Sequence, residues 1–120
     1  MLFRSESVPV TTLDRWASTE GMPPVDFVKV DIEGGEWWML RGAEEVLRAN
    51  PHIVIFFESE QDWCRRAGCR QEDSFGFLEG LGFGLYAWNA RRRTWQTDSQ
   101  ALLAAGLVWA SRKRAQLPVV

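Results

Sequence analysis

Apolar and polar positions along the chain follow two different periods, which predict strands and helices in turn. Val25 to Ile32 is rich in Val, Ile and Phe, and His52 to Phe57 (HIVIFF) is a continuous apolar run of strand length. Between them, residues 36–49 show the spacing of one helix face, with apolar side chains at positions 39, 40, 43, 46 and 47. Asn50 and Pro51 end this helix. Strand, helix and strand with short joints is the βαβ pattern, so we expect these two strands to be parallel.

The segment before this unit predicts one more strand end and one helix. Ser7 to Val10 is typical of the end of a strand. A short helix is expected to begin next, because Thr11 and Asp14 have the spacing of a capping box. Gly21 and the Pro23-Pro24 pair stop that helix.

The segment after Glu58 carries a weaker signal. Residues 59–73 predict a loop with some helix, and a short helix is expected over 74–81. Residues 83–88 and 106–110 flank the turn-like NARRRT and predict a terminal antiparallel strand pair. A continuous apolar strand such as IVIFF is expected when both faces of a sheet are covered, so the sheet is predicted to be mostly parallel. The predicted fold class is therefore α/β.

Length, charge and composition narrow the function classes. A chain of 120 residues with 46% apolar residues closes one core, so residues 1–120 are predicted to be a single domain. The chain has 14 Lys and Arg residues and 16 Asp and Glu residues. The resulting net charge of −2 argues against a nucleic-acid partner. No apolar run is long enough to span a membrane, and the N-terminus lacks the apolar core of a signal peptide. We therefore expect a cytoplasmic protein with no membrane partner.

Several residue types have a plain structural interpretation beside a functional one. Cys64 and Cys69 stand without a second Cys or His pair that would complete a zinc site, so ordinary thiols are expected. His52, at the start of an apolar run, is expected to be structural. The seven tryptophans are typical of core or interface residues, although they could also form an aromatic ligand wall. The runs Arg91–Arg93 and Arg112–Arg114 are expected to be solvated.

The end of the first predicted strand carries an unusual amount of charge. In open α/β sheets, ligands bind outside the carboxyl ends of the strands, which is where Asp31 and Glu33 lie. Gly34 allows a sharp turn or a close approach of the backbone to a ligand, and Glu36 suits the first turn of the following helix. Strand alternation places Asp31 on the same face as Lys29 and Phe27, a face predicted to be buried.

A second carboxylate is expected at the same edge. Glu58 follows IVIFF directly, so it and Asp31 would meet if the two strands are parallel neighbours. Paired acids there could orient a hydroxyl substrate, act as a general base, hold a divalent metal or fix a cationic cofactor. The alternative is that Lys29 neutralises Asp31 in a structural ion pair while Glu58 is merely solvated.

Three stretches carry a family resemblance: TTLDRW, DFVKVDIEGGEWWMLRGAEEVL and HIVIFFE. Together they resemble the FkbM-type methyltransferase family, which has a TLD element, a K-x-D-x-E-G-x-E strand and turn, a helix with L-x-G-A and a later strand ending in Glu. The resemblance covers about Val10 to Glu58 and fades afterwards. The matching residues are Lys29, Asp31, Glu33, Gly34, Glu36, Leu40, Gly42 and Ala43.

The resemblance implies a class I, Rossmann-like fold that uses S-adenosylmethionine to methylate a hydroxyl oxygen on a sugar, a polyketide or another small metabolite. Asp31 would line the junction of cofactor and acceptor, with Gly34 beside the cofactor. Glu33 or Glu58 would orient the acceptor or receive its proton, and Lys29 could tune these carboxylates. No protein metal ligand is implied.

The chain also departs from the family pattern. The family's glycine-rich D-x-G-A-N-x-G loop has no counterpart here, so the chain is expected to be the C-terminal part of such a domain, without the N-terminal glycine-rich cofactor-binding half, and to bind S-adenosylmethionine poorly alone. One alternative is a non-catalytic fold remnant that assembles with itself or with a complementing chain. Another is a small acid-lined binder of a metal or a sugar, built on Asp31, Glu33 and Glu58.

Overall fold

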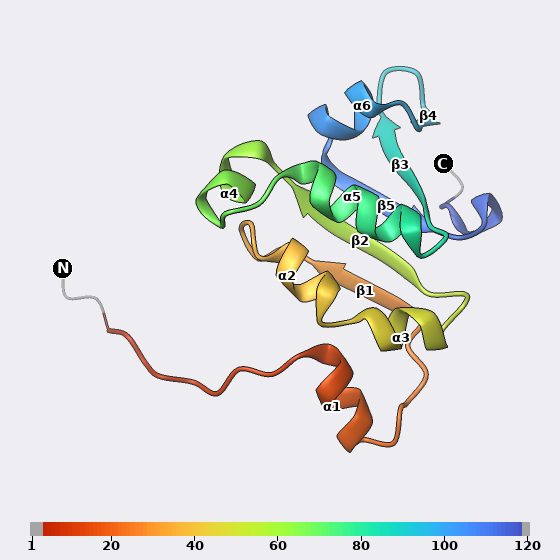
Figure 1. The fold of residues 1–120 in the computed structure, drawn as a ribbon. Coiled ribbons are helices and arrows are strands. Elements are labelled where there is room, and N and C mark those ends of the chain that lie inside the picture. The colour runs from red at the N-terminus through yellow and green to blue at the C-terminus, as the bar shows by residue number, and fades with distance from the viewer. Residues whose placement is uncertain (1–3, 119–120) are drawn as a thin grey trace.

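Five strands form one mixed sheet in the computed structural model, which describes residues 4–118 (Figure 1). The order across the sheet is β1-β2-β5-β3-β4. Only β1 and β2 are parallel, and the other three pairings are antiparallel. The strands are β1 (Phe27–Val30), β2 (Val54–Ser59), β3 (Gly84–Asn89), β4 (Thr94–Gln96) and β5 (Gly106–Ser111).

The fold is α/β, as predicted, but the prediction of a mostly parallel sheet is wrong. Gly106, the first residue of β5, pairs with Ser59, the last residue of β2. The chain therefore enters β5 at the edge where β2 ends, and β5 must run back in the opposite direction. A positive φ of 73° at Gly106 makes this sharp entry possible.

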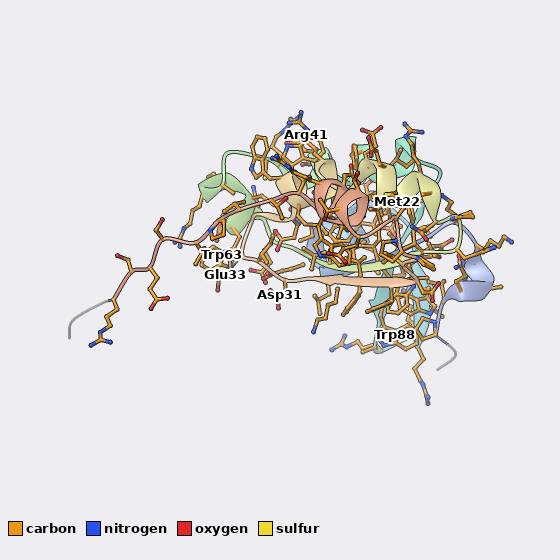
Figure 2. The ribbon with its side chains drawn as sticks, turned by 90° about the horizontal axis from the view of Figure 1, so that it is seen from below. Met22, Asp31, Glu33, Arg41, Trp63 and Trp88 are labelled. Atoms are coloured by element: carbon orange, nitrogen blue, oxygen red, sulfur yellow. The ribbon has the colours of Figure 1, made fainter. Side chains whose placement is uncertain are left out.

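Residues 4–118 form six α-helices. Figure 1 shows α2, α3 and α5 over one face of the sheet, with α1 next to α3 beyond the β1 edge, and Figure 2 shows these helices on one side of the strands with Trp88 on the other. The core lies between this helix layer and the sheet, with Leu40, Leu47, Ile55, Phe57 and Leu78 among its fully buried side chains. The helices are α1 (Leu13–Thr19), α2 (Glu36–Arg41), α3 (Glu44–Ala49), α4 (Gln61–Arg66), α5 (Gln71–Gly80) and α6 (Ser99–Ala104), followed by the 3-10 turn η1 (Arg114–Gln116).

The single helix predicted over residues 36–49 is divided into α2 and α3. Asp14 explains the break: its carboxylate accepts hydrogen bonds from the backbone N–H groups of Glu45 (3.0 Å) and Val46 (2.9 Å), which caps a new helix start. The capping box predicted for Thr11 and Asp14 is wrong for the same reason, because the Asp14 carboxylate caps α3. Thr12 is the N-cap of α1 instead, and its hydroxyl accepts from the N–H of Arg15.

The segments before and after the βαβ unit differ from the predicted elements in three places. Residues 7–10 are exposed and form no strand. The segment 59–73, predicted as a loop with some helix, contains α4 and the start of α5. The antiparallel pair of the two terminal apolar segments is confirmed as β3 and β5, but the NARRRT turn joins β3 to β4, and α6 was not predicted.

The arginine at position 112 is structural rather than solvated, which corrects the prediction for the basic tail. Its guanidinium donates to the carbonyls of Leu47 (2.8 Å), Asn50 (3.0 Å) and Leu81 (3.1 Å), and it lies over the ring of Phe83. Free carbonyls at helix ends favour a cation, so Arg112 joins the ends of α3 and α5. Burial lowers the pKa of this guanidinium.

The face of β1 that carries Phe27, Lys29 and Asp31 is exposed, so the prediction that it is buried is wrong. The opposite face of β1 meets the helices, with Val30 only 4% exposed. The prediction that Phe27, Lys29 and Asp31 share one face of β1 is correct, but the helix layer covers the opposite face, which carries Val30. None of the described helices is both long enough and apolar enough to cross a lipid bilayer.

Candidate active site

Three carboxyl groups meet where the parallel strands β1 and β2 end. Val30 pairs with Phe57, so the next residues along the two strands, Asp31 and Glu58, stand side by side. Oxygen atoms of Asp31, Glu58 and Glu36 all lie within 4.8 Å of one another. The structure thus brings together two of the three acids that the sequence placed at this edge, Asp31 and Glu58, and adds Glu36.

Glu36 holds the turn that follows β1. Its side chain is 3% exposed, and its carboxylate accepts hydrogen bonds from the N–H groups of Ile32 (2.8 Å) and Gly34 (2.9 Å). The prediction assigned Glu36 only to the start of a helix. Its role could have been found from its position three residues after Glu33 and directly after two glycines. A tight turn leaves backbone N–H groups free, and a nearby carboxylate can accept hydrogen bonds from them.

The turn itself explains Gly34. Glu33 and Gly34 both have positive φ, of 54° and 102°. A Cβ atom at Gly34 would lie 2.3 Å from the backbone oxygen of Trp63, so the turn packs directly on α4. Gly34 is therefore required for packing against the protein, and its contact with a cofactor stays a prediction.

The remaining predicted site residues lie near the cluster but are not part of it. Glu33 and Lys29 are both exposed, and Figure 2 shows Glu33 at the same end of β1 as Asp31. Within residues 4–118, Lys29 forms no ion pair with Asp31. The interpretation of Lys29 and Asp31 as a structural ion pair is therefore wrong.

The proton affinity of Glu58 is unusual. Its pKa is raised to about 7, first by a hydrogen bond with Asp31, then by burial, and then by repulsion from Asp31, Glu36 and Glu60. One of its oxygens, Oε2, is buried without a hydrogen-bond partner among the described residues. Glu58 therefore gains or loses its proton near neutral pH, which is the property that a general base or a hydroxyl-binding group needs.

A cleft opens beside these acids. Its volume is about 330 Å³, and we call it the acid cleft; its walls are Asp31, Glu58, Glu60, Ala105, Gly106 and Leu107. The adjoining hollow shares Glu60 and Gly106 with it, and its volume is about 310 Å³. Both hollows lie at the edge where β2 ends and β5 begins, so a small molecule can approach Asp31 and Glu58 from outside the sheet.

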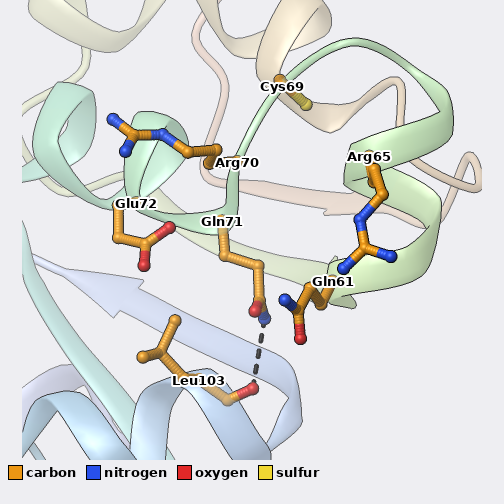
Figure 3. A pocket seen from close by; sticks show the side chains of 7 residues that line it. All are labelled: Gln61, Arg65, Cys69, Arg70, Gln71, Glu72 and Leu103. Atoms are coloured by element: carbon orange, nitrogen blue, oxygen red, sulfur yellow. Dashed lines mark hydrogen bonds between the residues drawn. The ribbon is translucent and has the colours of Figure 1, made fainter.

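A third cavity, of about 380 Å³, continues along the same edge and is lined by Gln61, Arg65, Cys69, Arg70, Gln71, Glu72 and Leu103 (Figure 3). The Gln71 side-chain amide donates to the carbonyl of Leu103 (3.2 Å) and to the carbonyl and hydroxyl oxygens of Ser59 (both 3.0 Å). These bonds fix α5 to β2 and α6, which keeps the edge rigid. Gln71 was not among the residues predicted from the sequence to contribute to the site.

The two cysteines add no reactive thiol to this edge. Both Cys64 and Cys69 are buried and free. Burial, and then the neighbouring Cys69, raises the pKa of Cys64 to about 12, and burial also raises the pKa of Cys69. Thiols with raised pKa values are poor nucleophiles at neutral pH, so the interpretation as ordinary thiols fits.

Comparison with known families identifies the class of protein. The model of the methyltransferase FkbM domain matches residues 2–83, more than half of the chain. The chain therefore belongs to the FkbM methyltransferase family, which confirms the resemblance, and the match includes Asp31, Glu36 and Glu58. No curated protein and no solved structure matches the chain. Membership supports methyl transfer as the general chemistry, and the family's methyl donor is S-adenosylmethionine.

Proposed function

We propose that this chain forms the acceptor side of an O-methyltransferase site, with a small-molecule hydroxyl bound at Asp31 and Glu58. The observation that carries the proposal is the half-buried Glu58 carboxyl beside Asp31, which has one oxygen, Oε2, without a hydrogen-bond partner among the described residues and a pKa raised to about 7. A methyl acceptor must lose its hydroxyl proton during or after attack, and a group with a pKa near 7 is well suited to accept it.

The described residues fit one end of S-adenosylmethionine. The carboxylates of the acid cleft suit a positively charged sulfonium, and no Lys or Arg lines that cleft. Residues 4–118 contain no glycine-rich loop that would receive the adenosine, so the fit is limited to the charged end. When bound, the cofactor supplies an electrophilic methyl group.

The roles of the protein residues follow from their positions. Asp31, which is exposed, accepts a hydrogen bond from the acceptor hydroxyl and orients it. Glu58, once deprotonated, takes the proton from that hydroxyl. Glu36 holds the turn that follows Asp31, because its own oxygens accept hydrogen bonds from the backbone of that turn. Because Glu58 must be ionised, we expect methyl transfer to increase as the pH rises through about 7.

The proposal is tested by comparing two ligands that differ in charge at sulfur. S-adenosylmethionine is a sulfonium cation, whereas S-adenosylhomocysteine is a neutral thioether. Calorimetric titration with each is expected to show weak binding that favours the cation. Asp31→Asn is expected to abolish this preference, and Glu33→Gln, the matched control in the same turn, is expected to keep it. Equal binding of the two ligands by the unaltered protein would contradict the proposed site.

A further inference from the structure

Three hollows follow one another along the edge where β2 ends, and together we call them the edge trough. The acid cleft shares Glu60 and Gly106 with the middle hollow. The middle hollow in turn shares Gln61 and Leu103 with the cavity of about 380 Å³ in Figure 3, which we call the arginine cavity. Because neighbouring hollows have walls in common, a molecule held in the acid cleft can extend into the arginine cavity.

The two ends of the edge trough carry opposite charge. The walls of the acid cleft include three carboxyl groups and no Lys or Arg. The walls of the arginine cavity include Arg65 and Arg70 and one carboxylate, Glu72. Lys29 is exposed two residues before Asp31 but lines none of the three hollows. The cations of the trough are therefore concentrated at the end away from the acids.

The guanidinium of Arg65 is available to an anion. It lies 3.9 Å from the Asp62 carboxylate, a long contact between side chains that are 71% and 85% exposed. Such an exposed pair contributes little and separates readily. Figure 3 shows Arg65 and Gln61 on one side of the cavity, with Arg70 and Glu72 on the other. A guanidinium offers paired N–H donors whose spacing matches a carboxylate or a phosphate.

Gln71 gives the same cavity a fixed hydrogen-bond acceptor. The residue is 6% exposed, and its Nε2 lies within hydrogen-bonding distance of three oxygens, two of Ser59 and one of Leu103. These acceptors require the amide nitrogen at this place, so Oε1 is the other atom of the amide. Within residues 4–118, Oε1 accepts no hydrogen bond, and it is not among the fully buried unpartnered atoms. It is therefore left for a donor on a ligand.

We propose that the edge trough binds a methyl acceptor that carries a carboxylate or a phosphate, with this anionic group at Arg65 and the reacting hydroxyl at Asp31 and Glu58. The inference rests on the proposed function and names a substrate class for it. Arg65 and the Gln61 amide donate hydrogen bonds to the anionic oxygens. Gln71 Oε1 accepts a hydrogen bond from a neighbouring hydroxyl of the same molecule.

The opposite charges of the two ends orient such an acceptor. Its anionic group is repelled by the carboxylates of the acid cleft and attracted by Arg65, so its hydroxyl end enters the cleft. A neutral acceptor has no such preference and could enter in either direction. The hydrogen bonds of Gln71 tie α5 to β2 and α6, which keeps the spacing between the two ends constant. The edge trough thus selects an acceptor by its charge and by the distance between its two groups.

The test is a titration of the full chain with straight-chain hydroxy acids of increasing length, beginning with glycolate, each compared with the neutral diol of the same length. In nitrogen NMR, the Arg65 Nε–H and Gln71 side-chain amide signals report the anionic group, and the carbon signal of the Glu58 carboxyl reports the hydroxyl. We expect the hydroxy acids to shift the Arg65 signal and the diols to leave it unchanged. Above a certain chain length, the Glu58 signal should respond as well. Hydroxyalkyl phosphates of the same lengths show which anion is preferred.

Three substitutions of exposed side chains make the test specific. Arg65→Gln is expected to weaken the binding of hydroxy acids about tenfold, because charge-assisted hydrogen bonds are lost. Glu72→Gln is expected to strengthen it, because it removes a carboxylate from the cavity wall. Arg66→Gln is the matched control: Arg66 follows Arg65 directly but lies over the ring of Trp63 and lines no part of the trough, so its binding should equal that of the unaltered chain. Circular dichroism checks that each variant is folded.

Three results would overturn the proposal: equal binding of hydroxy acids and diols, an affinity unchanged by Arg65→Gln, or a Glu58 signal that responds at no chain length. A failure of the proposed function has a different outcome. A site that ignores the charge at sulfur would lose its methyl donor while hydroxy acids still bind at Arg65. Conversely, loss of the anion site would leave the preference for the sulfonium intact.

Discussion

Carboxyl oxygens of Glu58 and Asp31 lie within 4.8 Å of one another, and the pairing of these two acids is the largest cause of the raised pKa of Glu58, which is about 7. Asp31→Asn removes both the charge and the carboxylate partner. We therefore expect the pKa of Glu58 to fall well below 7 in this variant, towards the ordinary value of 4.5. Carbon NMR of labelled glutamate side chains measures this directly. Glu33→Gln, the nearby control, is expected to leave the value unchanged.

The same carboxyl group links stability to pH. Between pH 4.5 and about 7, Glu58 holds more protons in the folded state than in the unfolded state. The free energy of unfolding therefore decreases as the pH rises through this window. Glu58→Gln lacks this titration. The free energy of unfolding of this variant should therefore rise relative to that of the unaltered protein between pH 4.5 and pH 8. Urea unfolding at several pH values provides the comparison, and parallel curves for the two proteins would contradict the assignment.

Gly34 is the position where the turn after β1 tolerates no side chain. Gly34→Ala is expected to cost about 1–3 kcal/mol, because a Cβ would collide with the backbone of Trp63 and φ is positive. Gly76→Ala is the control: this glycine lies inside α5, nothing stands within 4 Å of its Cβ position, and the change should stabilise the helix by about 0.5–1 kcal/mol. Thermal unfolding of the two variants should move in opposite directions.

Asp14 connects α1 to the start of α3. Asp14→Ala removes the acceptor of two backbone N–H groups, those of Glu45 and Val46, and is expected to cost about 0.5–2 kcal/mol. Asp62→Ala, at an exposed carboxylate with only a long contact to Arg65, is expected to change stability by less than about 0.5 kcal/mol. If both variants unfold at the same denaturant concentration, the cap does not contribute as described.

The βαβ unit could be read from the sequence because it rests on local periodicity. The apolar runs around Val28 and Ile55 predicted two parallel strands. Because the carboxyl ends of parallel neighbours meet at one edge, the sequence also predicted that Asp31 and Glu58 lie side by side, as they do in the structure. The rest depends on contacts between distant segments. Asp14 breaks a helix more than thirty residues further along, and Arg112 joins two helix ends, which no local pattern reveals.

The exposed side of the sheet was the hardest feature to predict. Alternation along β1 correctly grouped Phe27, Lys29 and Asp31 on one face, but it cannot say which face the helices cover. The aromatic residues therefore predicted a buried face where the structure has an open one. The buried role of Glu36 was missed for a related reason, because its hydrogen bonds depend on the shape of the turn.

The most direct test of the account is the pKa of Glu58, measured by NMR with and without millimolar S-adenosylmethionine. We expect a pKa of about 7 for Glu58 in the free protein, which falls when the sulfonium is added and stays constant with the same concentration of S-adenosylhomocysteine. A value that does not respond to S-adenosylmethionine, or responds equally to both compounds, would show that the acids at this edge do not face the methyl donor.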